Sequence, residues 1–128
     1  MRYNGPARKA RAARRGGWSV RPRWRVTRGT QIALGPGKAD LLEAIGRTGS
    51  ISAAAADLGM SYRRAWLLVD TMYRCFSRPL VATTSQRSQG ATLTKDGRRV
   101  LDLYRLIEAK SVAATSKEAH ELKRRLRR

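Results

Sequence analysis

Apolar residues recur at helical spacing in three stretches of the chain, and glycine, proline or polar residues separate these stretches. The stretch 38–48 carries leucine, alanine and isoleucine on one side, which predicts a helix that ends near Gly49. A second helical pattern runs from 61 to about 76, and Pro79 is expected to terminate it. A third pattern follows Thr94, whose side chain suits a helix N-cap, and continues toward the C-terminus. Its apolar face comprises Val100, Leu103, Tyr104 and Ile107.

Shorter segments predict β-structure between and before these helices. Residues 24–34 contain β-branched positions and form a plausible strand that Gly29 weakens. Residues 80–84 and 91–94 are two further strand candidates, and the polar segment 85–90 lies between them. This arrangement predicts a hairpin directly after the second helix.

The segment 49–66 predicts two short helices joined by a tight turn. Ser50 and Ser52 are candidate caps for the first helix, because a serine oxygen accepts hydrogen bonds from free N–H groups at a helix start. Gly59 follows where that helix should end and tolerates the positive φ of such a turn. Ser61 is a suitable cap for the next helix. The segment therefore predicts a helix-turn-helix.

The second helix of this pair begins with an exposed polar turn formed by Tyr62, Arg63 and Arg64. Behind that turn, apolar residues recur as a stripe that we expect to be buried: Ala65, Trp66, Val69, Met72 and Phe76. We expect Trp66 in the core because it falls on a stripe with Val69 and Tyr73. An exposed first turn with cations, together with a buried apolar side, is typical of a helix whose N-terminal turn contacts base edges in the major groove.

A helix, a helix-turn-helix, a hairpin and a closing helix, in that order, define a winged helix-turn-helix domain. The predicted fold class is thus mainly α with a small β wing. We expect a basic flexible arm at 1–23, the winged domain at 24–112 and a basic helical extension at 113–128.

The charge distribution favours a polyanionic partner. The chain carries 28 Lys and Arg against 9 Asp and Glu, a net charge of +19. Ten basic residues and no acidic residue lie in 1–28, whereas 117–128 holds six basic and two acidic residues. Most of the excess charge therefore lies at the two ends.

The remaining composition excludes several classes of protein. Cys75 and His120 are the only residues of their types, so neither an intramolecular disulfide nor a Cys/His metal cluster is expected. No apolar run approaches the length of a membrane span, and no phosphate-binding loop, carboxylate pair or catalytic triad is recognisable. We therefore expect a cytoplasmic protein, located at the nucleoid, that is not an enzyme and has no metal site and no cofactor.

A specific set of residues resembles a known family. The segments LLEAIGRTGSISAAAADLGMSYRRAW, LVATT and LTKDGRRVLDLY, within 41–104, are similar to the N-terminal DNA-binding domain of the molybdate-responsive ModE-type regulators, which is LysR-like. The resemblance covers roughly half of the chain. It implies a homodimeric transcription regulator whose helix from Ser61 lies in the major groove and which dimerises partly through its terminal helices and strand.

Two departures limit what the resemblance implies. The wing of the family is usually glycine-rich, whereas 84–90 holds a single glycine. The molybdate-binding module of the family follows the DNA-binding domain, and this sequence ends at Arg128. We therefore expect no molybdate binding.

The leading hypothesis is a sequence-specific regulator that binds double-stranded DNA as a homodimer, with a recognition helix at about 61–76 and a wing at about 80–94 on adjacent DNA. An architectural, nonspecific nucleic-acid-binding protein is the alternative, and an RNA-binding or ribosome-associated protein is a third hypothesis. The predicted DNA-binding residues are Ser52, Ser61, Tyr62, Arg63, Arg64, Arg87, Ser88, Arg8, Lys9, Arg11, Arg14 and Arg15. The predicted dimer contacts are Val100, Leu103, Tyr104 and Ile107.

Overall fold

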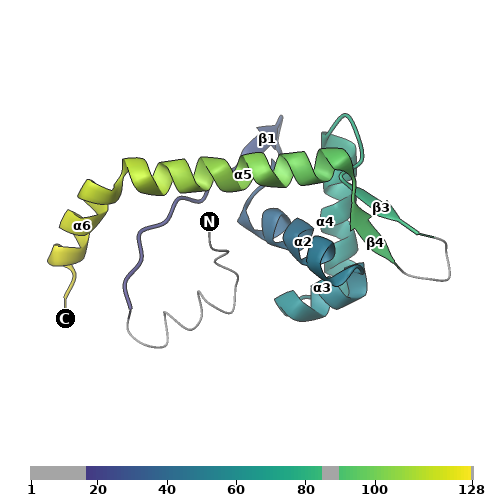
Figure 1. Ribbon diagram of the computed structural model, residues 1–128, viewed down its shortest axis with the longest axis horizontal. Coiled ribbons are helices and arrows are strands. Elements are labelled where there is room, and N and C mark those ends of the chain that lie inside the picture. Colours follow the sequence, from purple (N-terminus) through teal and green to yellow (C-terminus); the bar gives the residue numbers. More distant parts are fainter. Residues whose placement is uncertain (1–16, 85–89, 128) are drawn as a thin grey trace.

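The computed structural model describes residues 17–84 and 90–127. Helices dominate, and two small antiparallel hairpins accompany them (Figure 1). In chain order the elements are β1 (Val26–Arg28), β2 (Gln31–Leu34), α2 (Pro36–Thr48), α3 (Ile51–Leu58), α4 (Tyr62–Cys75), β3 (Val81–Thr83), β4 (Ala91–Leu93), α5 (Lys95–Ala114) and α6 (Ser116–Arg125). The predicted fold class, a mainly α winged helix-turn-helix, is confirmed.

The N-terminal β-structure is a hairpin, where the sequence predicted one weakened strand. β1 pairs with β2 across a turn at Gly29, whose φ of 61° lies in the left-handed region that favours glycine. The glycine that weakened the expected strand is thus the residue that reverses the chain. The following helix α2 begins at Pro36, two residues before the predicted start, because proline suits the first helical turn.

The helix-turn-helix forms as the sequence predicts. The Ser50 hydroxyl accepts a hydrogen bond from the Ala53 N–H at 2.8 Å and caps α3. Gly59 ends α3 with a φ of 69°, and the Ser61 hydroxyl then accepts from the Arg64 N–H at 3.0 Å to cap α4. Ser52, the other candidate cap, is the second residue of α3 and is exposed.

The predicted wing is the β3–β4 hairpin, which is tied to the domain at its base. Val81 pairs with Leu93 and Thr83 with Ala91, and the Ala91 N–H donates to the Gly49 carbonyl at 2.9 Å. Thr94 caps α5 by accepting from the Gly97 N–H at 2.9 Å and donates its hydroxyl to the Pro79 carbonyl. These bonds fix the hairpin beside the helix-turn-helix.

Helix α2 lies at the centre of the hydrophobic core. On one side, Leu41 and Ile45 pack with buried residues of α3 and α4; on the other, Leu42 packs with residues of β2, α4 and α5. Both groups of buried side chains include residues of α2. Because every other helix of the domain rests on α2, its packing sets the position of α4.

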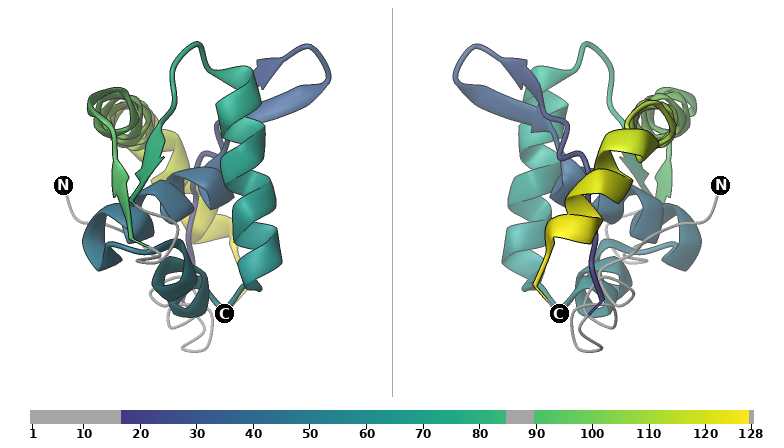
Figure 2. Two further views of the ribbon diagram at one scale, coloured as in Figure 1. Left: turned by 90° about the vertical axis from the view of Figure 1, so that its right-hand side faces the viewer. Right: turned by 90° about the vertical axis from the view of Figure 1, so that its left-hand side faces the viewer.

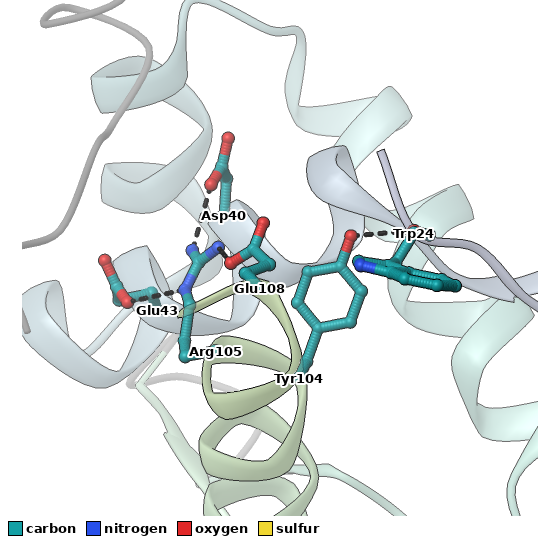
Figure 3. Close-up of polar contacts among 6 residues, drawn as sticks. All are labelled: Trp24, Asp40, Glu43, Tyr104, Arg105 and Glu108. Carbon is teal, nitrogen blue, oxygen red and sulfur yellow. Dashed lines mark hydrogen bonds and ion pairs between the residues drawn. The ribbon is translucent and has the colours of Figure 1, made fainter. Parts of the chain in front are cut away.

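Helix α5 has two distinct apolar sides, which corrects the single face predicted from the sequence. Leu101 and Tyr104 are buried in the core, whereas Leu103, Leu106 and Ile107 are exposed. The Tyr104 hydroxyl donates to the Trp24 carbonyl at 2.7 Å (Figure 3). Burial and the negative charge of Glu108 raise the pKa of Tyr104 to about 12, which keeps this donor protonated. Tyr104 therefore belongs to the hydrophobic core of the chain, and its side chain is not exposed as the predicted dimer contact requires.

A partly buried ionic cluster joins α5 to α2 next to Tyr104. The Arg105 guanidinium donates to Asp40 at 3.0 Å, to Glu43 at 3.2 Å and to Glu108 at 2.9 Å (Figure 3). Burial lowers the pKa of Arg105, but its hydrogen bonds to Glu108 and Asp40 outweigh burial and raise the pKa above its ordinary value. For Glu43, burial exceeds the attraction of Arg105 and raises the carboxyl pKa. One guanidinium thus contacts carboxylates from both helices.

The chain beyond α5 turns at Thr115 into α6, where the sequence predicted one continuous helix. Residues 17–23, part of the predicted arm, include Trp18, whose ring meets His120 edge-on at 6.1 Å. The Lys123 ammonium lies 4.6 Å from the centre of the same ring. α6 lies at the end of α5 remote from α4 and the wing (Figure 1).

We predict that Gly97→Ala lowers the free energy of unfolding by about 1 to 3 kcal/mol. A Cβ at Gly97 would overlap the backbone carbonyl oxygen of Leu80, because α5 crosses the start of the wing there. Gly37→Ala is the matched control, since a Cβ at that helical position meets nothing within 4 Å. Urea unfolding followed by circular dichroism measures both variants. Equal stabilities of the two variants would contradict the close approach.

We predict that Arg105→Met lowers the free energy of unfolding by about 3 to 5 kcal/mol at neutral pH, because it removes the guanidinium that Asp40, Glu43 and Glu108 all contact. Their pKa values in the folded variant then rise above those of the unfolded chain, so stability is retained at low pH and lost as pH rises. The deficit relative to the parent should therefore shrink near pH 4 in urea unfolding.

The control for this variant is Arg125→Met, which removes an exposed pair with Glu121 at 3.4 Å and should change stability by less than about 1 kcal/mol. A deficit of Arg105→Met that is the same at pH 4 and pH 7 would show that Arg105 does not stabilise the fold through its charge.

Candidate nucleic-acid interface

The first turn of α4 presents three polar side chains to solvent. Tyr62, Arg63 and Arg64 are exposed, and the Ser61 cap fixes the backbone from which they project. Ala65 and Met72 lie on the opposite side of the helix and are buried against the core. This geometry agrees with the predicted division of α4 into a buried stripe and an exposed first turn.

The buried stripe of α4 is narrower than predicted. Trp66 is 39% exposed and Tyr73 is 64% exposed, so the expectation that both lie in the core is wrong. They are about 80 to 120° around the helix from Ala65 and Met72, beyond the width of the packed side. Both line a groove between α4 and the wing that Val81 and Thr83 border from β3. The Tyr62 and Trp66 rings meet edge to face at 6.2 Å.

The charges at the start of α4 oppose the helix dipole. The first turn carries no acidic residue, although a helix N-terminus favours negative charge. Among the described residues, neither Arg63 nor Arg64 takes part in an ion pair, whereas Arg47 pairs with Asp57 and Arg74 pairs with Asp70. Two cations at the positive end of a helix favour a bound anion at that end.

Lys38, which was not predicted as a site residue, adds to this positive field. Burial lowers the pKa of the Lys38 ammonium, the charge of Cys75 raises it, and the charge of Arg64 lowers it further. Lys38 is thus within electrostatic reach of Arg64, although 26 positions separate them in the sequence. No local pattern revealed this, because α2 and α4 meet only in the folded domain.

Several predicted contacts lie elsewhere. Ser52 is exposed on α3, on the helix that precedes the recognition helix. The other predicted DNA contacts lie outside the described residues: Arg87 and Ser88 of the wing, and Arg8, Lys9, Arg11, Arg14 and Arg15 of the arm. The structure therefore brings together Ser61, Tyr62, Arg63 and Arg64.

The predicted dimer residues divide between the two sides of α5. Leu103 is 41% exposed and Ile107 is 44% exposed, while Val100 is half-buried and Tyr104 is in the core. Leu106, which is 49% exposed, joins the outer side and was not predicted to do so. Its position next to Ile107 in the sequence could have indicated a wider face.

Two other kinds of feature are absent from the part of the chain that the structure describes. No group of His, Cys, Asp and Glu side chains among the described residues is arranged to hold a metal ion. None of the helices in the same part of the chain is long and apolar enough to cross a membrane.

The helix-turn-helix and its wing match a known family of domains. Residues 38–98 match the family described as bacterial regulatory helix-turn-helix protein, lysR family. This match runs from the first turn of α2 into the first turn of α5, so it covers the helix-turn-helix and the wing but neither the N-terminal hairpin nor the rest of α5. Residues 38–98 form a lysR-type helix-turn-helix domain, as expected from the sequence.

Three relatives are similar to this chain over more than half of its length. The chain is 43% identical over 82 residues to the molybdenum-pterin-binding protein MopB of Rhodobacter capsulatus. The aligned residues cover 62% of this chain and 30% of MopB. The chain is 38% identical over 92 residues to the molybdenum transport protein ModE of Azotobacter vinelandii, covering 70% and 34%. It is 39% identical over 74 residues to the DNA-binding transcriptional dual regulator ModE of Escherichia coli K12, covering 56% and 28%.

These matches confirm the ModE-like character expected from the sequence. The chain spans about a third of the length of these curated relatives.

Proposed function

We propose that this protein is a sequence-specific DNA-binding transcriptional regulator that acts as a homodimer and places the N-terminal half of α4 in the major groove. The observation that carries this proposal is the first turn of α4, where Tyr62, Arg63 and Arg64 are exposed on a lysR-type helix-turn-helix. Arginine is the commonest side chain that recognises guanine O6 and N7 in the major groove.

The placement of these arginines supports a role in binding rather than in stability. Each cation near a helix N-terminus opposes the helix dipole by about 0.3 to 1 kcal/mol. Arg63 and Arg64 carry this cost, and no ion pair with another described residue offsets it. A phosphate or a guanine edge would supply the missing acceptors.

The homodimer is supported by the outer side of α5. Leu103, Leu106 and Ile107 form an exposed apolar strip on a helix of 20 residues, and the core of the protomer uses the other side. A second copy of α5 would cover this strip and would relate two recognition helices by a twofold axis. Two such helices would meet successive major-groove faces about 34 Å apart, so we expect an inverted-repeat site.

The wing and the arm would add phosphate or minor-groove contacts. Arg87 and Ser88 lie outside the described residues, in the part of the sequence between β3 and β4. The arm supplies Arg8, Lys9, Arg11, Arg14 and Arg15. Basic arms of this kind bind DNA with little choice of sequence.

The net charge of +19 favours a second candidate, an architectural protein that binds nucleic acid without sequence choice. The ratio of affinity for the best duplex to that for random duplex, at one salt concentration, separates the two functions. A specific regulator gives a ratio of about 10³ or more, whereas an architectural protein gives a ratio near one.

We predict that Arg63→Ala or Arg64→Ala costs about 1 to 3 kcal/mol of binding at the preferred duplex and relaxes base choice there. The same variants should unfold at equal or higher urea concentration than the parent, because each removes a cation from a helix N-terminus. Fluorescence anisotropy with preferred and random duplexes measures the first effect, and urea unfolding measures the second.

The comparison variant lacks residues 2–16, which hold six basic residues and end before the Trp18 contact with α6. It should weaken binding to preferred and random duplexes alike and reduce the slope of log K against log salt by about 0.9 for each phosphate that the arm neutralises in the parent. Loss of site preference in this truncation, with both alanine variants binding like the parent, would overturn the assignment of α4 in favour of the architectural function.

We predict that Leu103→Lys converts the dimer to a monomer at micromolar concentration, because it places a charge in the centre of the apolar strip of α5. Since Leu103 is exposed in the protomer, folding should be unaffected. Val112→Lys is the control: Val112 is 49% exposed but lies about 180° around the helix from Leu103. Sedimentation velocity measures both. A parent protein that is monomeric with and without DNA would refute the homodimer.

A further inference from the structure

Leu67 is a large apolar side chain on the outermost side of α4. It is 57% exposed, the highest value among the leucines of the helix-turn-helix. It follows the buried Ala65 by two positions, so it lies about 200° around the helix and faces away from the core. A lone exposed leucine is common on protein surfaces, so its neighbours decide whether it has a role.

The neighbours of Leu67 are polar and charged. Arg63 lies one turn before it on the same side of α4, and Arg74 and Asp70 follow on that side as an ion pair of 3.1 Å. The Thr71 hydroxyl donates to the Leu67 carbonyl at 2.9 Å, which supports a regular helix at this point. The outer side of α4 therefore carries one apolar residue between two arginines.

Other surfaces of the protomer do not account for Leu67. The exposed strip Leu103, Leu106 and Ile107 belongs to α5, which lies across the domain from α4 (Figure 2). The groove beside the wing is lined by Trp66 and Tyr73, and Leu67 is not among its residues. Dimerisation through α5 would leave Leu67 exposed.

Resting on the proposed function, we propose that Leu67 is a specificity-determining residue that contacts the C5-methyl group of a thymine in the major groove. Thymine is the only base that presents a methyl group there, and apolar side chains recognise it by contact. Leu67 lies four residues after Arg63, which places it about 6 Å further along the helix axis. Because successive bases of one strand are about 3.4 Å apart, the thymine should lie within about two steps of the guanine that Arg63 contacts.

The experiment begins with selection of the preferred duplex by the full-length parent from a random pool. Each thymine of the selected site is then replaced singly by 2′-deoxyuridine, which removes only the methyl group. In each half-site, deoxyuridine at one thymine near a guanine should weaken binding of the parent protein about fourfold. This is the change in affinity expected when the burial of one methyl group is lost. Leu67→Ala should bind the parent duplex several-fold more weakly and should show no further loss with deoxyuridine.

Leu122→Ala is the matched control, because Leu122 is 54% exposed on α6, remote from α4. It should retain the full deoxyuridine effect. A parent that is indifferent to deoxyuridine at every thymine, or a Leu67→Ala variant as sensitive to deoxyuridine as the parent, overturns this inference and leaves the proposed function intact. A parent that selects no sequence from the pool overturns both.

Discussion

The partly buried cluster around Arg105 is the interaction on which the arrangement of this domain depends. Three of the nine acidic residues in a chain of net charge +19 meet one arginine between α2 and α5. The cluster lies next to Tyr104, so ionic contacts and apolar packing fix the same turn of α5 against α2. With α5 held in this rotation, Leu103, Leu106 and Ile107 must face outward. The cluster thereby determines which apolar side of the helix is left exposed.

The same central helix, α2, links this cluster to the candidate interface. α2 packs through Leu41 and Ile45 on the helix-turn-helix and through Leu42 on the α5 side. Capping bonds at Ser50 and Ser61 then set where α3 and α4 begin. Because the backbone of α4 is fixed in this way, its first turn holds Arg63 and Arg64 against the helix dipole. A domain that binds an anion at that turn gains from this arrangement, whereas an isolated domain does not.

Local signals were sufficient to predict much of the fold. The caps Ser50, Ser61 and Thr94 and the turn at Gly59 act within a few residues, so the helix-turn-helix and the start of α5 follow directly from the sequence. The wing was predicted for the same reason, since a polar turn separates its two short strands. The exposed positions of Tyr62, Arg63 and Arg64 follow from helical periodicity.

The features that were not predicted depend on contacts between distant residues. Tyr104 and Leu103 are adjacent and both apolar, and only the packing of α5 on α2 decides which of them is buried. Trp66 and Tyr73 lie at the edge of the buried side of α4, where the position of the wing leaves them exposed. The Arg105 cluster joins residues more than 60 positions apart, a separation at which charge pairing leaves no periodic pattern.

The central claim is that the N-terminal half of α4 lies in the major groove, and methylation interference on the preferred duplex tests it most directly. Dimethyl sulfate methylates guanine at N7, on the major-groove edge, and adenine at N3, on the minor-groove edge, and the bound and free fractions are compared at each base. The account predicts that N7 methylation of a guanine in each of two half-sites prevents binding. Binding that tolerates methylation of every guanine N7 and is blocked only by adenine N3 methylation would contradict it.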